Sequence, residues 1–370
     1  MSFEPRNVFI TGGAGFIGAN FVRHWLSATT QGKVVVYDAL TYAGNIENLA
    51  GLDKNPRYSF VRGDICDEAA VREIVEQQQI DTIVHFAAES HVDRSILGPD
   101  DFIRTNVVGT HALLKVAKAA WIDRKLVPAH RFHHVSTDEV YGSLRPDDAP
   151  FHEATPYAPN SPYSATKAAS DHLVRAYHET YGLSTTITNC SNNYGPYHFP
   201  EKLIPLTIIN ILHGKPLPVY GDGLQIRDWL YVADHCEGIW LALTRGKPGE
   251  VYNIGGNSET ANIEIVKTLC GLVDEHLASD PSLLNIFPES PTSTGKPAEA
   301  LITYVRDRPG HDRRYAIDYR KAARDLGYAP SKALAQGLKE TMLWYTTNTA
   351  WWQSLLGRDY SAWIEKNYKR

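Results

Sequence analysis

The chain has 370 residues, of which 43% are apolar and 21% charged, and this is the composition of a soluble globular protein. Its formal net charge of −5 argues against a mainly electrostatic nucleic-acid binder, since there is no basic excess to neutralise phosphates. No apolar run approaches the roughly 18 residues that span a bilayer. The four cysteines lie far apart, and the start lacks the regions of a signal peptide. We therefore expect a cytoplasmic protein without nucleic-acid or membrane partners.

Six short runs of β-branched and aromatic residues in the first half are predicted as strands. They cover residues 8–11, 33–38, 58–64, 82–87, 132–136 and 185–191. Nearly all are apolar on both faces, which favours a parallel sheet covered by helices. A helical period runs through 107–121, and a second helix follows Ser161 and Pro162, a plausible cap and first-turn proline. This alternation predicts an α/β, Rossmann-like, doubly wound parallel sheet.

The amino-acid composition changes after Tyr194, where prolines and aromatic residues become more frequent. Residues 278–300 are rich in Pro, Ser and Thr, and we expect them to form a surface loop. A smaller second lobe, built mostly from the chain after Tyr194, would create a cleft over the carboxyl edge of the sheet. Open α/β folds bind their ligands at that edge.

The first predicted turn carries Gly12, Gly15 and Gly18 between a strand and a helix. Glycines there let backbone N–H groups approach a pyrophosphate, which the helix N-terminus also attracts. The pattern alone is equally compatible with an ordinary tight turn. Asp38 ends the next strand, twenty residues after Gly18, where a carboxylate can accept bonds from ribose hydroxyls. Because it would repel the phosphate of NADP, the predicted cofactor is NAD.

Tyr163 and Lys167 form a Tyr-x-x-x-Lys pair at the start of a predicted helix, so both lie on one face. A lysine ammonium near the phenol favours phenolate, as does an oxidised nicotinamide. Lowering the pKa of a tyrosine from about 10 to near 7 requires roughly 4 kcal/mol, which two cations in a dry cleft could supply. Such a base can remove a hydroxyl proton while hydride leaves the same carbon. A surface Tyr–Lys pair is the alternative, and the glycine motif disfavours it.

These motifs resemble the extended short-chain dehydrogenase/reductase superfamily. A longer series narrows the resemblance to the dTDP-glucose 4,6-dehydratase family, and it runs from near the start to about Asp318. The series comprises AAESHVDRSI, TNVVGT, HHVSTDEVYG, SPYSATKAASDHLVRAY, TNCSNNYGPYHFPEKLIPL, YGDGLQIRDWLYV, YNIGG and DRPGHDRRYAID. Leu97, where an acid is expected, and Ala233 are small departures that touch no residue with assigned chemistry.

The resemblance implies an NAD-dependent lyase (a hydro-lyase) that converts dTDP-glucose to dTDP-4-keto-6-deoxy-glucose by an internal redox cycle. Tyr163 takes the C4 hydroxyl proton as C4 hydride passes to NAD, and Thr137 hydrogen-bonds the C4 oxygen. Glu139 then removes the C5 proton while Asp138 protonates the departing C6 hydroxyl. Hydride returns to C6 and a proton to C5, so NAD is regenerated.

The acid pair makes chemical sense in this setting, because elimination needs an acid and a base at neighbouring carbons. Two close carboxylates cannot easily both ionise, so one can stay protonated. Adjacent strand residues face opposite sides, and the strand must therefore end before Asp138 if both acids are to face the sugar. The alternative is that Asp138 caps a turn while Glu139 pairs with a lysine.

The resemblance also assigns the remaining contacts. Residues expected at the cofactor, besides Tyr163 and Lys167, are Gly12, Gly15, Phe16, Ile17, Gly18, Asp38, Leu40, Thr41, Asp64, Ile65, Ala87, Ala88, Glu89, Thr105 and Asn193. Residues expected at the nucleotide sugar, besides Thr137, are Ser90, Asn192, Lys202, Leu203, Pro218, Tyr220, Arg227, Asn262, Asp307, Arg308 and His311. Arg227 and Lys202 can neutralise a diphosphate. The histidines show no metal spacing, and we expect no metal.

We expect an NAD-binding domain of residues 1–194 with about 229–262, and a nucleotide-sugar lobe of 195–228 and 263–350. Residues 351–370 are expected to form a helical tail. The two helices at 107–121 and after Ser161 match those through which relatives form homodimers as a four-helix bundle, although sequence pattern alone cannot separate that face from core.

Three alternatives remain. A nucleotide-sugar 4-epimerase shares the glycines, Tyr163 and Lys167 but typically has Ser-Ser in place of Asp138 and Glu139. A GDP-mannose dehydratase usually has NADP features, which Asp38 disfavours. A non-catalytic NAD-sensing module would not need the intact catalytic set. The sequence does not distinguish thymine from uracil in the base pocket, or name the pathway that uses the product.

Overall fold

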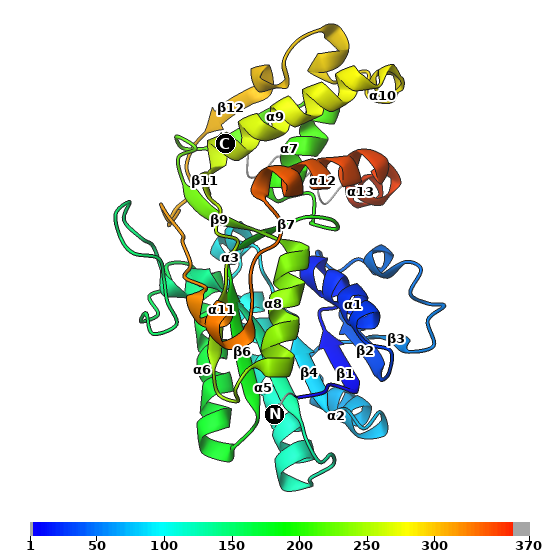
Figure 1. Cartoon of the computed structure of the whole chain (residues 1–370), viewed down its shortest axis with the longest axis vertical. Helices are drawn as coiled ribbons and strands as arrows, with labels where there is room; N and C mark the ends of the chain where they lie inside the picture. Colours follow the sequence, from blue (N-terminus) through cyan, green and yellow to red (C-terminus); the bar gives the residue numbers. More distant parts are fainter. Residues whose placement is uncertain (1–2, 358–370) are drawn as a thin grey trace.

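The computed structural model describes residues 3–357, and its centre is a seven-stranded sheet (Figure 1). The strand order is β10-β6-β5-β4-β1-β2-β3, and every neighbouring pair is parallel. Its strands are β1 (Asn7–Thr11), β2 (Lys33–Asp38), β3 (Tyr58–Arg62), β4 (Thr82–His85), β5 (Arg131–Thr137), β6 (Thr185–Cys190) and β10 (Val251–Ile254). The wound parallel sheet and its six predicted strands are confirmed. The seventh, β10, lies after Tyr194, where the composition changes, and it was not predicted.

Helices cover both faces of this sheet. On one face α1 (Phe16–Ala28) packs beside α8 (Val232–Arg245), and their apolar sides share a buried cluster with β1 and β2. On the other face lie α2 (Glu68–Gln77), α5 (Thr110–Ala117) and α6 (Pro162–Tyr181) over a second cluster. The predicted start of α6 is confirmed, since Ser161 and Ser164 form a capping box and Pro162 opens the first turn.

The predicted helix over 107–121 is present, but only its middle is α-helical. Flanking α5 are the π-helical turns η2 (Ile103–Gly109) and η3 (Lys118–Asp123). The carbonyl of Asn106, within η2, accepts hydrogen bonds from the hydroxyls of Thr110 and Ser170. Side chains of two helices thus satisfy a backbone group at a widened turn, which a periodicity argument does not anticipate.

A smaller apolar core lies beyond the carboxyl edge of the large sheet. It is built around α7 (Leu203–Leu212), α9 (Asn262–Ser279), α12 (Leu334–Thr347) and α13 (Thr349–Leu355). Two small sheets accompany these helices: β7 (Asn192–Tyr194), β9 (Ile226–Tyr231) and β11 (Glu259–Ala261) form one, and β8 (Leu217–Tyr220) pairs with β12 (Ile302–Val305). Trp352 of α13 is fully buried in this core. The expected tail of 351–370 begins here, but residues 358–370 lie outside the described part.

The expected loop at 278–300 is wrong in part. It contains α10 (Pro281–Ile286) and the 3₁₀ turns η5 (Pro291–Thr294) and η6 (Ala298–Leu301). Asp280 caps α10 through the N–H of Ser282, and Phe287 reaches the buried core. Local capping and apolar side chains that reach the core, among them Phe287 and Ala298, order a segment whose overall composition suggested a loop.

The remaining elements are short connections. They are η1 (Ile46–Leu49), α3 (Val92–Leu97), α4 (Asp100–Phe102), η4 (Asp138–Tyr141) and α11 (Arg320–Leu326). Between residues 3 and 357, none of the helices combines the length and the apolar character that crossing a bilayer demands.

Candidate active site

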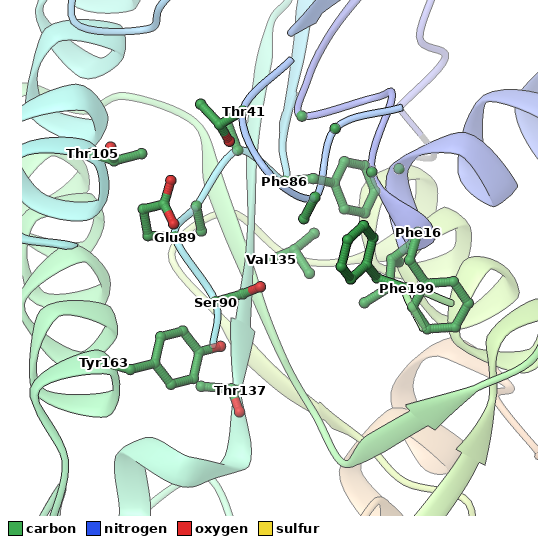
Figure 2. Close-up of a pocket in the computed structure, with 18 of the residues that line it drawn as sticks. Phe16, Thr41, Phe86, Glu89, Ser90, Thr105, Val135, Thr137, Tyr163 and Phe199 are labelled. Atoms are coloured by element: carbon green, nitrogen blue, oxygen red, sulfur yellow. The ribbon is translucent and has the colours of Figure 1, made fainter. Parts of the chain in front are cut away.

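A cavity of about 910 Å³ lies at the carboxyl ends of β1, β2, β4, β5 and β6, and α7 borders it from the smaller core (Figure 2). It collects most of the residues that the sequence pointed to. Those on its wall are Gly12, Gly15, Phe16, Ile17, Gly18, Asp38, Thr41, Asp64, Ile65, Ala87, Ala88, Glu89, Ser90, Thr105, Thr137, Asp138, Glu139, Tyr163, Lys167, Asn192, Asn193, Lys202 and Leu203.

The glycine turn between β1 and α1 forms one end of the cavity. Gly12 has φ +71°, and a Cβ there would lie 2.5 Å from the backbone nitrogen of Ala87. A Cβ on Gly18 would lie 2.3 Å from the carbonyl oxygen of Gly12. Neither position accepts a side chain unless the backbone moves. Because the turn is packed this tightly, the N-terminus of α1 lies close to the cavity. Backbone N–H groups at a helix start suit a pyrophosphate.

Asp38 closes this end of the cavity from β2. Its carboxylate oxygens accept the N–H groups of Ala14, at 2.9 Å, and Leu40, at 2.8 Å. Burial raises the pKa of Asp38, and the two backbone N–H donors oppose that rise. The carboxylate thus holds together the loop after β1, through Ala14, and the loop after β2, through Leu40. It still faces the cavity, where its remaining lone pairs can accept hydrogen bonds from ribose hydroxyls. Leu40 contributes its backbone to this brace and does not line the cavity.

The strand break required by the acid pair is confirmed. β5 ends at Thr137, and the 3₁₀ turn η4 begins at Asp138, so both acids line the cavity. The Thr137 hydroxyl accepts the N–H of Glu139 at 3.3 Å and lies 3.5 Å from Oδ1 of Asp138. Thr137 also hydrogen-bonds the phenol of Tyr163, and Figure 2 shows these two side chains together.

The two acids have unlike electrostatic surroundings. Burial, and then the charge of Glu139, raises the pKa of Asp138 far above its ordinary value. Burial also raises the pKa of Glu139, but Arg308, Arg227 and Lys202 oppose the rise. Asp138 therefore holds its proton more firmly, and Glu139 is the acid that ionises first.

The Tyr163–Lys167 pair is buried at the start of α6. The Lys167 ammonium donates to the carbonyl oxygen of Val135 at 2.8 Å, and the charge of Asp171 opposes the lowering of its pKa by burial. Burial, followed by the charge of Glu139, raises the pKa of Tyr163 well above its ordinary value. The expected lowering of this pKa depends on two cations, Lys167 and an oxidised nicotinamide, and it stays a prediction for the protein with its cofactor bound.

Several residues predicted at the sugar are not part of the cavity wall: Pro218, Tyr220, Arg227, Asn262, Asp307, Arg308 and His311. Arg308 pairs with Asp93 at 3.3 Å, and the Tyr220 hydroxyl donates to the same carboxylate at 3.3 Å. The Arg227 guanidinium donates to backbone carbonyls and stacks on the Tyr315 ring at 4.2 Å. Arg227 and Arg308 nevertheless lie close enough to Glu139 to affect its ionisation.

Sequence reasoning missed part of the wall. His198, which stacks on the predicted Phe16, was not anticipated. Nor was Arg94, which lies over the Tyr42 ring at 4.0 Å and pairs with buried Glu201 at 3.2 Å. Arg94 and Glu201 fall inside the motifs that carry the resemblance. Nothing in their spacing indicates a role, because the pair forms only when α3 meets the segment before α7.

The wound sheet, the glycine turn and the buried Tyr–Lys pair beside two acids define an extended short-chain dehydrogenase/reductase of the kind that acts on nucleotide sugars. A family model described as GDP-mannose 4,6 dehydratase matches residues 9–341. The chain is 54% identical to the dTDP-glucose 4,6-dehydratase of Neisseria meningitidis serogroup B, over 96% of this chain and 97% of that one. Identity with the enzyme of the same name from Xanthomonas campestris pv. campestris (strain B100) is 56%, over 95% and 96%. The chain belongs to the dTDP-glucose 4,6-dehydratase family.

Solved structures agree with this assignment. The dTDP-glucose 4,6-dehydratase of Bacillus anthracis, in complex with NAD, has a TM-score of 0.81 and 44% identity, covering 95% of this chain and 99% of that one. The Streptomyces venezuelae enzyme with NAD and TYD bound has a TM-score of 0.81 and 46% identity, covering 94% and 99%. A UDP-glucose 4-epimerase from Thermotoga maritima shares the fold, with a TM-score of 0.77, but only 28% of its sequence.

Proposed function

We propose that the chain is an NAD-dependent hydro-lyase that converts dTDP-glucose to dTDP-4-keto-6-deoxy-glucose. The observation that carries this function is the placement of Asp138 and Glu139 in one turn, both on the cavity wall, with unlike charged neighbours. The relatives that bear the dehydratase name share more than half of the sequence. Epimerases, which need no elimination acid or base, are more distant.

The residues present fit NAD. The glycine turn leaves no room for side chains where a pyrophosphate would lie, and Asp38 can accept the ribose hydroxyls. Around these two sites the wall supplies Phe16, Ile17, Thr41, Asp64, Ile65, Ala87, Ala88, Glu89, Thr105 and Asn193. When bound, NAD supplies the hydride acceptor for C4, the hydride donor for C6 and a positive ring beside Tyr163.

The first task of the protein is to remove the proton of the C4 hydroxyl. Tyr163 is the base, and Thr137, which hydrogen-bonds its phenol, also holds the C4 oxygen. Lys167 is fixed by the Val135 carbonyl, and its buried ammonium favours phenolate over phenol when a substrate oxygen is present.

The second task is to remove water across C5 and C6. The new C4 ketone acidifies the C5 hydrogen, which Glu139 takes. Asp138, whose pKa burial raises, protonates the departing C6 oxygen. Glu139 later returns its proton to C5, and the cations around it lower the cost of its negative charge in the meantime.

The cradle for the nucleotide sugar is formed by Ser90, Asn192, Lys202 and Leu203 on the wall and by the cluster of Arg227, Arg308 and Tyr220 near it. Lys202 and the two arginines supply the positive charge that a diphosphate needs. Residues 195–228 and 263–350 then form the nucleotide-sugar lobe, and residues 1–194 with about 229–262 form the NAD-binding domain.

A homodimer through α5 and α6 completes the proposal. These helices pack side by side in Figure 1, and large apolar side chains are exposed on and near them. Val108 and Ile103 are each 51% exposed, and Tyr181 is 44% exposed. A second copy would cover them as a four-helix bundle. We place the enzyme in the cytoplasm, where the buried thiols Cys190, Cys236 and Cys270 stay reduced.

The test is turnover without added cofactor. Purified protein given dTDP-glucose should develop the alkali-dependent absorbance of a 4-keto-6-deoxy sugar, and UDP-glucose run beside it measures the choice of base. Absence of product, or product only with stoichiometric accumulation of NADH, contradicts the proposal. Release of dTDP-galactose instead would identify an epimerase.

A further inference from the structure

The proposed cycle leaves two side chains in the wrong protonation state. The O4 proton passes to Tyr163, and Asp138 gives its proton to the O6 that leaves as water. The C5 proton goes to Glu139 and back to C5, and the C4 hydride, carried meanwhile on the cofactor, ends on C6. The sum is one proton gained by Tyr163 and one lost by Asp138. Before the next turnover, Tyr163 must therefore lose a proton and Asp138 must gain one.

Neither group is well exposed to bulk water. Tyr163 is 9% exposed and Asp138 is 1% exposed. Between them lies the hydroxyl of Thr137, which hydrogen-bonds the Tyr163 phenol and approaches Oδ1 of Asp138 to 3.5 Å. A single side chain thus connects the group that gains a proton with the group that loses one.

The hydrogen bonding of Thr137 is directional. A hydroxyl has one proton and two lone pairs, and the N–H of Glu139, which can only donate, occupies one lone pair. The other lone pair and the proton remain for Tyr163 and Asp138. One of these two must then donate to Thr137 while the other accepts from it. Reversing both bonds together moves one proton along the line.

We propose that Thr137 is the proton relay that resets the active site, passing its hydroxyl proton to Oδ1 of Asp138 as it receives the phenol proton of Tyr163. Atoms balance, because two O–H bonds break and two form while Thr137 ends as it began. A half-turn of the Asp138 carboxyl group brings the new proton to the side of Oδ2. That oxygen is buried without a hydrogen-bond partner in the described part of the chain, so it is available to bond the departing C6 oxygen once the sugar is bound.

This inference rests on the proposed function and gives Thr137 a second role beyond holding O4. Lys167 is a competing carrier, but its ammonium donates to the Val135 carbonyl and lies beside His134, which contacts Asp171. The Cys190 thiol, also close, bonds the Ser136 carbonyl and the Asn193 amide. Among the described residues, Thr137 has the hydrogen bonds that join the two groups.

The test compares Thr137→Val, which keeps the shape and deletes the hydroxyl, with Thr137→Ser, which keeps the hydroxyl. Both variants and the wild type, with their NAD content and circular dichroism matched, are mixed with excess dTDP-glucose in a rapid-quench apparatus. Thr137→Val, which also loses its bond to O4, should form the first equivalent of product per active site more slowly than the wild type. Each later turnover should then be about 10²-fold slower than that first one, since general acid–base catalysis commonly supplies 10²–10⁴-fold. The wild type and Thr137→Ser should show no such break.

A small proton carrier provides a second readout. Imidazole should accelerate the later turnovers of Thr137→Val and leave its first turnover unchanged. If the later turnovers of Thr137→Val are as fast as its own first turnover and imidazole accelerates neither, Asp138 regains its proton by another route and the relay is wrong. Failure of the wild type to form product would contradict the proposed function instead.

Discussion

The two ends of the cavity are built in different ways. The cofactor end is made of backbone and small residues from short, contiguous motifs, and Gly12 to Gly18 with Asp38 form most of it. The proposed sugar end depends on buried and half-buried charged side chains from well-separated segments, among them Glu139 on the wall and the Asp93–Arg308 pair near it. One end is therefore specified by local sequence, and the other exists only after the smaller core has packed over the sheet.

Replacing the base of the elimination step should separate the two ends most sharply. Glu139→Gln should lower the dehydration rate by about 10²–10⁴-fold, the usual contribution of a positioned base, and leave C4 oxidation in place. The reduced cofactor should then accumulate, as measured by its absorbance after addition of dTDP-glucose. Tyr163→Phe is the matched control, because it should slow the appearance of reduced cofactor itself. Normal dehydration by Glu139→Gln would mean that another base exists.

A methyl group at the glycine turn should damage the cofactor end alone. Gly12 has a positive φ, and the Cβ of Gly12→Ala would lie 2.5 Å from the backbone nitrogen of Ala87. Gly51 also has a positive φ, +82°, but no atom lies within 4 Å of its Cβ position. Gly51→Ala should therefore cost only the left-handed backbone term, roughly 1–2 kcal/mol. Gly12→Ala should cost more and lose bound NAD. Thermal unfolding and NAD content after purification measure both, and equal losses would refute the close-packing argument.

The sugar end is tested by Arg308→Lys, which keeps the charge and removes the planar fork that pairs with Asp93. We expect KM for dTDP-glucose to rise about 10-fold, or roughly 1.4 kcal/mol, with a smaller change in kcat. Arg313→Lys is the matched control, since its pair with Asp222 lies at the surface with both side chains about half exposed. Equal effects on KM would remove Arg308 from the cradle.

The smallest expected effect is on stability. Because burial raises the pKa of Asp138 in the folded protein, the folded state binds a proton that the unfolded state has already released. The contribution of Asp138 to the free energy of unfolding therefore falls as the pH rises from the pKa of Asp138 in the unfolded state toward its pKa in the folded state. Asp138→Asn removes the dependence, so its Tm should exceed that of the wild type by roughly 1–3 °C at pH 7 and by less at pH 4. An unchanged difference between the two pH values would contradict the assignment.

The contrast between the two ends also explains what could be predicted from sequence. The parallel sheet, the cap of α6 and the break at Asp138 follow from local pattern, and all three are confirmed. The pKa of Tyr163 could not be predicted, because it depends on burial and on carboxylates that only tertiary packing brings near. The Arg94–Glu201 pair and the π-helical turns beside α5 likewise need contacts between distant segments.

The path of the chain between the two cores has an evolutionary consequence. Residues of the smaller core come from Tyr194 to Trp229 and again from Ile263 to Trp352. Between them in sequence lie β10, a strand of the large sheet, and α8, which packs on one face of that sheet. Because segments of the two cores alternate along the chain, no single chain boundary separates the residues of one core from those of the other. New sugar specificities therefore could not be acquired by joining a ready-made module to an end of the gene. They would have to arise by substitution in place, with the nicotinamide half present throughout.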